Sequence, residues 1–115
     1  MTLQRFLAAF LAVQLLAVLA AVPALASGKS QTLSGTVSDA MCGPKHQMGD
    51  AAACTRACVQ HGSKYALVVG DRVYTLETTD KAALDKLNVL AGANAKVTGE
   101  VKGDSIAVKS VAAGS

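Results

Sequence analysis

Residues 65–77 read YALVVGDRVYTLE, two apolar runs on either side of Gly70-Asp71. Both runs are rich in valine, leucine and tyrosine and have the length of ordinary strands. A two-residue loop that begins with glycine favours a type II′ turn, which joins antiparallel strands. The sequence therefore predicts a β-hairpin with strands at 65–69 and 72–77, in which Tyr65 and Tyr74 are cross-strand partners.

The residues after the hairpin predict a helix. It is expected from Lys81 to Ala91, because Asp80 is a favourable N-cap and Gly92 stands just past the end. Its apolar stripe, which should pack on the core, consists of Ala83, Leu84, Leu87, Leu90 and Ala91.

Two strands are expected after this helix, at 94–101 and 105–111, with a turn at Gly103-Asp104. We expect the last residues, 112–115, to fray. A further strand is expected before the hairpin, at 32–38, where apolar and polar residues alternate. In that strand the inward positions are Leu33, Gly35 and Val37, and the outward positions are Thr32, Ser34, Thr36 and Ser38.

The expected order is strand, Cys/His loop, two strands, helix, two strands. A glycine inside the first strand, Gly35, favours a bulge or bend of the kind that lets a small sheet close. The predicted class is mainly β with one or two helices, arranged as a small OB-like five-stranded barrel. An open α+β sheet is the alternative.

The first 26 residues have the pattern of a secretory signal peptide. Arg5 precedes an apolar stretch, Phe6 to Val22, that is interrupted only by Gln14, and Ala24-Leu25-Ala26 forms an A-x-A cleavage site. We therefore expect residues 1–26 to be removed and residues 27–115 to form one domain. The expected location is the periplasm or the outside of a bacterial cell.

The mature domain would carry a small net charge. Loss of Arg5 leaves ten Lys and Arg residues against eight Asp and Glu residues, or about +2, and the charges are dispersed with mixed signs. No basic block indicates a nucleic acid or an anionic membrane as the partner. We expect no nucleic acid and no membrane contact after cleavage.

All three cysteines and both histidines of the chain fall between Cys42 and His61, with the spacing C-x3-H-x7-C-x3-C-x2-H. A short helix is expected at 51–61, capped by Asp50, and it would place Cys54 and Cys58 on one face. Thiolates and imidazoles are the preferred ligands of zinc, and thiolates with thioethers favour Cu⁺. The predicted ligands of zinc or copper are Cys42, His46, Cys54 and Cys58, with Asp39 as a supporting partner and His61 as an alternative ligand.

Two other interpretations of the cysteines stay open. In an exported protein, Cys42 could form a disulfide with Cys54 or Cys58 and leave one thiol spare. Such a staple would stabilise the fold by about 2–3 kcal/mol. The loop would then belong to a non-catalytic interaction module whose protein partner is unknown. Thiol redox chemistry is the remaining interpretation, but the sequence lacks the C-x-x-C spacing typical of it.

No catalytic motif indicates an enzyme. The sequence contains neither a G-x-S-x-G element nor a phosphate-binding glycine loop, so we expect a binding domain and no catalytic residues.

The stretch SDAMCGPKH at 38–46, followed by Cys54-x3-Cys58, resembles an uncharacterised family of small exported bacterial domains. That family carries an S-D-x-x-C-G-x-x-H stretch, paired cysteines and a β-rich second half. The resemblance covers most of residues 32–111. It implies that Asp39, Cys42, Gly43, His46, Cys54 and Cys58 are signature positions, and it implies no activity.

Overall fold

The structure is a computed structural model, and it describes residues 29–46 and 49–114. The expected signal peptide, residues 1–26, lies outside the described residues, as does Ser115. Within the described part, neither helix combines the length and hydropathy that crossing a bilayer requires.

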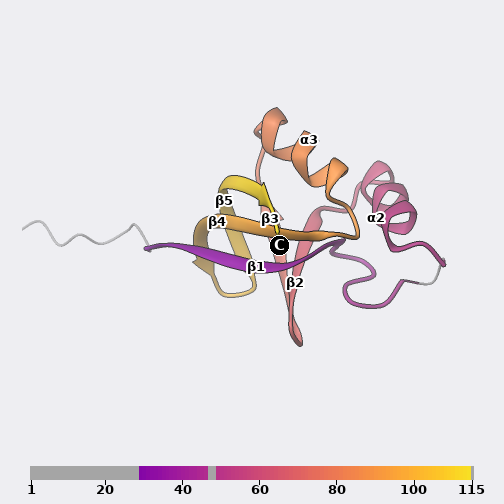
Figure 1. Ribbon diagram of the computed structural model, residues 1–115, viewed down its shortest axis with the longest axis horizontal. Helices are drawn as coiled ribbons and strands as arrows, with labels where there is room; N and C mark the ends of the chain where they lie inside the picture. Colours follow the sequence, from indigo (N-terminus) through magenta and orange to yellow (C-terminus); the bar gives the residue numbers. More distant parts are fainter. Residues whose placement is uncertain (1–28, 47–48, 115) are drawn as a thin grey trace, which may run out of the picture.

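In this described part of the chain, five strands and two helices follow one another in the expected order (Figure 1). They are β1 (Ser30–Asp39), α2 (Ala51–Gln60), β2 (Tyr65–Val69), β3 (Arg72–Glu77), α3 (Lys81–Val89), β4 (Asn94–Lys102) and β5 (Ser105–Ala113). The strand order is β1-β2-β3-β5-β4, and the sheet closes because β1 pairs with both β2 and β4. The β3–β5 pair is parallel and the other pairs are antiparallel. The prediction of a small, mainly β fold is therefore confirmed, and the open sheet is not observed.

The hairpin has its predicted bounds, and Gly70 at its turn has a positive φ of 58°. The prediction that Tyr65 and Tyr74 are cross-strand partners is wrong, because Tyr74 lies opposite Leu67 and Tyr65 lies opposite Asp39 of β1. Both helices begin at the predicted residues. The side chains of Asp50 and Asp80 accept hydrogen bonds from Ala52 N and Ala83 N, which are amides of the first turns of α2 and α3.

Two glycines allow the strands to come close enough for closure. Gly35 stands just before the segment of β1 that pairs with β2, and a Cβ there would overlap the carbonyl oxygen of Val68. Gly99 stands at a register shift between β4 and β5, and a Cβ there would overlap the carbonyl oxygen of Ala107. Glycine is required at both positions because any side chain would push the neighbouring strand away.

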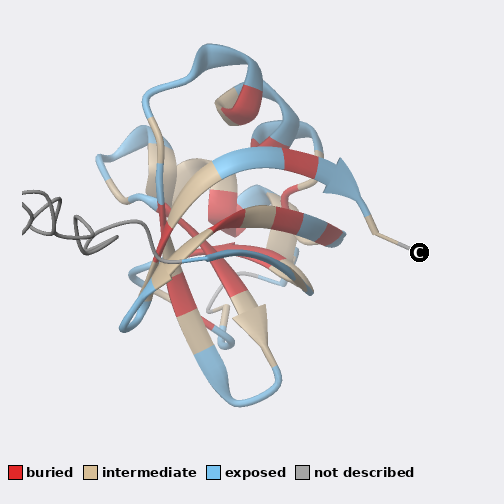
Figure 2. Cartoon of the chain, turned by 90° about the vertical axis from the view of Figure 1, so that its left-hand side faces the viewer, coloured by how far each residue is buried: buried red, intermediate tan, exposed pale blue. Residues whose placement is uncertain are grey.

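The core fills the inside of the closed sheet, and α3 covers one end of it (Figure 2). The buried cluster consists of Val37, Tyr65, Leu67, Tyr74, Leu76, Ala83, Leu87, Ala95, Val97, Ile106 and Val111. The predicted apolar stripe packs on the core, since Ala83, Leu87 and Ala91 are buried and Leu84 and Leu90 pack against the cluster. The helix is shorter than predicted, because α3 ends at Val89 and the last two residues of the stripe follow it. Each fully buried Val, Leu or Ile contributes roughly 1.5–3 kcal/mol.

The end of β5 is more ordered than expected. Ala112 and Ala113 do not fray, because they pair with Lys96 and Ala95 of β4. Gly114 N donates a further hydrogen bond of 2.8 Å to Asn94 O. The prediction that residues 112–115 fray is therefore wrong for these positions, since β4 is long enough to pair with them.

Candidate metal centre

The helix α2 presents two of the three cysteines to β1. It lies beside the end of β1, as Figure 1 shows, and it begins at Ala51 because Asp50 Oδ1 accepts a hydrogen bond of 3.0 Å from Ala52 N. Cys54 and Cys58 are four residues apart, so their side chains share one face of the helix. Cys54 is 3% exposed and Cys58 is half-buried.

A tight turn after β1 brings the third cysteine to the same place. Asp39 is the last residue of β1, and its Oδ2 accepts hydrogen bonds from Met41 N at 3.1 Å and Cys42 N at 3.0 Å. Gly43 N donates to Asp39 O at 2.9 Å, and Gly43 has a positive φ of 57°. An aspartate that accepts from amides two and three residues later stabilises such a turn.

The three thiols form a compact group. Cys42 Sγ lies 3.9 Å from Cys54 Sγ and 3.8 Å from Cys58 Sγ. These sulfurs are not bonded, since a disulfide bond is about 2.05 Å long; all three cysteines are free. Thiolates about 2.3 Å from one tetrahedral zinc ion would be about 3.8 Å apart. The group could hold a metal ion.

A second group of potential metal ligands shares Cys42 with the group of three thiols. Ligand atoms of Asp39, Cys42 and His46 all lie within 4.8 Å of one another. Two of these side chains have buried atoms with no hydrogen-bond partner, namely Asp39 Oδ1 and His46 Nδ1. Buried polar atoms without a partner are uncommon in folded proteins, and an unseen ion is one of their ordinary explanations.

The hydrogen bonds of Ser38 indicate the tautomer of His46. Ser38 Oγ donates its only proton to Gly43 O, and it also lies 3.3 Å from His46 Nε2. Nε2 must therefore be the donor in that second hydrogen bond. In a neutral imidazole the lone pair is then on Nδ1, the atom that has no partner. His46 consequently presents Nδ1 as its available ligand atom.

The structure brings five of the six candidate residues together. Cys42, Cys54 and Cys58 form one group, and Asp39 and His46 lie on the Cys42 side of it. The alternative ligand His61 is exposed at the C-terminal cap of α2 and belongs to neither group.

Sequence reasoning missed Ser38. The alternation of β1 placed it among the outward polar residues, but it is fully buried. The expectation was wrong because the Cys/His loop covers the outer face of β1 at this end. The signal that could have indicated the burial of Ser38 is its position close to a loop rich in potential ligands.

The thiols of Cys42 and Cys58 are poorly ionised without a metal. Burial raises the pKa of Cys58 to about 12, with further contributions from its hydrogen bond with Cys42 and from the negative charge of Asp39. At Cys42 the hydrogen bond with Cys58 lowers the pKa. Burial, the hydrogen bond with Cys54 and the charge of Asp39 together outweigh it and leave the pKa raised. A reactive redox cysteine needs a lowered pKa, so these values do not favour thiol redox chemistry.

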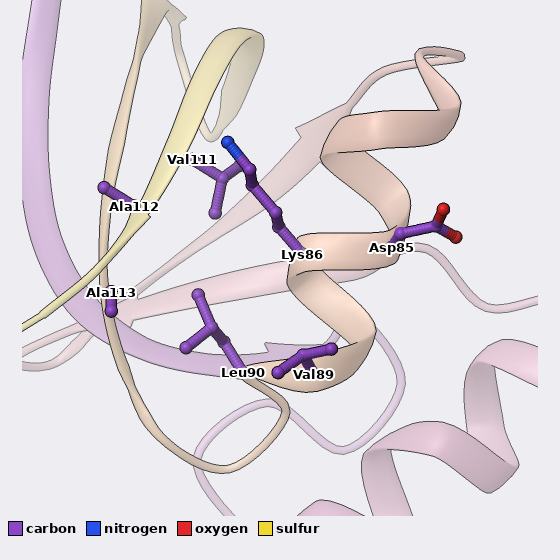
Figure 3. A pocket seen from close by; sticks show the side chains of 7 residues that line it. All are labelled: Asp85, Lys86, Val89, Leu90, Val111, Ala112 and Ala113. Atoms are coloured by element: carbon purple, nitrogen blue, oxygen red, sulfur yellow. The ribbon is translucent and has the colours of Figure 1, made fainter.

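Two hollows of the described surface bear on the location of the site. A pocket of about 250 Å³ lies beside the site and is lined in part by Ser38, Gly43 and His46. A larger apolar pocket of about 480 Å³ lies between α3 and β5 (Figure 3). Its two charged side chains are Asp85, which points away from the hollow, and Lys86, which extends along it toward Val111. The larger pocket therefore has no group of ligand atoms, and the candidate chemistry lies at the cysteines.

No family model, curated protein or solved structure matches this chain. The functional argument therefore depends on the site itself.

Proposed function

We propose that this protein is an exported binding domain that takes up one transition-metal ion, zinc or copper. The thiolates of Cys42, Cys54 and Cys58 supply three ligands, and His46 or Asp39 supplies the fourth. The observation that carries this proposal is the spacing of the sulfurs, 3.8 and 3.9 Å from Cys42. This is the spacing that a tetrahedral zinc thiolate site needs.

The ligands are held in advance of binding. Asp39 fixes the turn that carries Cys42, and Asp50 fixes the start of the helix that carries Cys54 and Cys58. A site whose ligands are already in place loses less conformational entropy on binding, and this favours tight binding.

A metal would also help a domain of this size to fold. Residues 27–115 form a short chain that buries a smaller fraction of its surface on folding than a larger domain does, so an added ion would contribute materially. An ion at the site would join the turn after β1 to α2, because its ligands come from both segments. The binding free energy of such an ion adds to the folding free energy.

The disulfide-stapled interaction module is the second candidate function. Cys42 Sγ is about equally close to both other sulfurs, so a small movement would allow a bond to either of them. An exported compartment is oxidising and would favour that bond. In that case the loop is a rigid surface for a protein partner, and no ion is bound.

Native mass spectrometry of the protein, purified from an exported preparation without chelator, tests both candidates. A stoichiometric metal mass on a chain with three intact thiols supports the proposal and identifies the ion. A metal-free chain two hydrogens lighter than the reduced mass contradicts it and supports the stapled module. The same spectrum tests export, because cleavage after Ala26 gives a chain that begins at Ser27.

A further inference from the structure

We infer that Asp39 is the fourth ligand of the ion and that its carboxylate makes the centre select a divalent ion, Zn²⁺, over Cu⁺. This inference rests on the proposed function, and it assigns two features that the proposal leaves open. These are the fourth ligand and the metal.

Asp39 has one carboxylate oxygen, Oδ1, that is available to bind a metal ion. Its side chain is fully buried, and Oδ2 is occupied by the amides of Met41 and Cys42. Oδ1 is buried and accepts no hydrogen bond. None of the ion pairs found among residues 29–46 and 49–114 involves this carboxylate. A buried carboxylate without a cation is unfavourable, and a bound ion would supply the missing charge.

Asp39 is also held more firmly than His46. It lies within the β1–β2 pairing, opposite Tyr65, and two amides orient its side chain. His46 lies on the loop, and its ring has one hydrogen bond, to Ser38. Ligand atoms of Asp39 and Cys42 lie within 4.8 Å of each other, so the carboxylate is next to the cysteine that both groups share. His46 is the residue that this inference places outside the ligand set, beside the centre.

The charges at the site favour a divalent ion. Three thiolates and one carboxylate carry four negative charges. Zn²⁺ would reduce this to two and Cu⁺ only to three, and a larger net charge in a partly buried site costs more free energy. Donor type favours the same ion, because Cu⁺ prefers sulfur alone whereas zinc accepts carboxylate oxygen. Met41, the thioether next to Cys42, is 74% exposed, so most of its surface faces solvent.

X-ray absorption spectroscopy of the zinc-loaded wild-type protein tests the ligand set directly. We expect three sulfur ligands and one oxygen, without the outer-shell scattering that an imidazole ring produces. Imidazole scattering would overturn the inference, because it would place His46 on the metal. This measurement needs no variant and so does not depend on whether a variant folds.

The matched variants Asp39→Asn and His46→Gln test the selectivity. Asparagine keeps an oxygen that can accept the turn amides, but it removes the anionic ligand. Chelator competition should show that Asp39→Asn lowers Zn²⁺ affinity by more than about 100-fold and Cu⁺ affinity by less than about tenfold, since loss of a ligand exceeds the effect of an outer partner. His46→Gln should lower Zn²⁺ affinity less, by at most about 10–100-fold, the range for an outer partner.

A larger loss of Zn²⁺ affinity in His46→Gln than in Asp39→Asn would overturn the inference. Equal losses of Zn²⁺ and Cu⁺ affinity in Asp39→Asn would also overturn it. If the wild-type protein binds neither Zn²⁺ nor Cu⁺, the proposed function itself fails. The two failures are therefore distinguishable. Circular dichroism of each metal-free variant checks that its fold is retained.

Discussion

At the scale of single residues, Asp39 links backbone structure to ligand chemistry. One carboxylate oxygen shapes the turn that presents Cys42, and the other lies unpaired beside the thiols. The same negative charge helps to keep the thiols of Cys42 and Cys58 protonated when no cation is present. Uptake of an ion by this site would therefore be coupled to ionisation of its ligands, with release of protons.

The raised pKa of Cys58 predicts how the metal-free, reduced protein responds to alkaline pH. The folded state keeps this proton up to about pH 12, whereas an unfolded thiol loses it near its ordinary value of 9.0. Between these values the unfolded chain binds fewer protons than the folded chain, so the free energy of unfolding falls as pH rises. Urea unfolding at pH 8 and pH 10.5 should therefore show a lower midpoint at the higher pH.

Cys58→Ala is the control for this prediction, because lysines and tyrosines also titrate in that range. The variant should lose less stability than the wild type between the two pH values. An equal loss in both proteins would show that Cys58 does not carry the effect.

The sequence identified most of the site at the residue scale, because ligand-capable side chains are few and lie together. Cys42, Cys54, Cys58 and His46 could be selected from residue type and spacing alone. The sequence did not reveal Ser38, since alternation along a strand does not show which outward residues a loop will cover. The proximity of unpartnered ligand atoms on Asp39 and His46 is likewise a property of tertiary structure.

At the scale of elements, the N-cap of α2 should matter for metal affinity as well as for stability. Asp50→Ala removes the hydrogen bond to Ala52 N and should lower the free energy of unfolding by about 0.5–2 kcal/mol. Because α2 carries Cys54 and Cys58, fraying of its first turn should also weaken zinc binding. If ordering this turn costs about 1 kcal/mol, zinc affinity should fall about fivefold. Chemical unfolding and chelator competition measure the two effects.

Asp80→Ala is the matched control, since Asp80 caps α3 in the same way but that helix carries no ligand. It should reduce stability by a similar amount and leave zinc affinity unchanged. If both variants lose affinity equally, the loss reflects global stability, and the role assigned to the α2 cap is wrong.

Closure of the sheet gives a second prediction at this scale. Gly99→Ala places a methyl group against the Ala107 carbonyl at the bulge between β4 and β5. We expect a loss of about 1–3 kcal/mol in the free energy of unfolding, because neither strand can move without losing its pairing. Gly49→Ala, where a Cβ would meet nothing within 4 Å, should change stability by less than about 1 kcal/mol. Thermal unfolding of the two variants compares them, and similar values would contradict the proposed steric role.

At the scale of the whole molecule, local patterns predicted the order of elements well. The hairpin at 65–77 and the caps at Asp50 and Asp80 were identified because turn and capping residues act over a few positions. Closure could only be inferred by analogy, since it depends on β1 pairing with two strands and on the parallel contact of β3 with β5. The pairing of β5 as far as Ala113 also depends on a strand that is distant in sequence, β4, so no local pattern predicts it.

Because the domain is small, metal binding should produce a large shift in its thermal stability. An ion that binds only the folded state at 100 times its Kd adds about 2.7 kcal/mol to the free energy of unfolding. For a domain of 60–100 residues this corresponds to a rise in Tm of roughly 10–20 °C. Zinc added to the reduced protein should produce this rise, and a chelator should reverse it.

Cys42→Ser provides the control for the thermal shift, because Cys42 is the residue shared by both ligand groups. This variant should show a much smaller rise with zinc. An oxidised sample in which Cys42 is bonded to Cys54 or Cys58 should likewise fail to respond, since two of its ligands are consumed. A wild-type protein whose Tm is the same with zinc and with chelator would contradict metal binding. If the oxidised form were then the more stable one, the loop would be maintained by a disulfide.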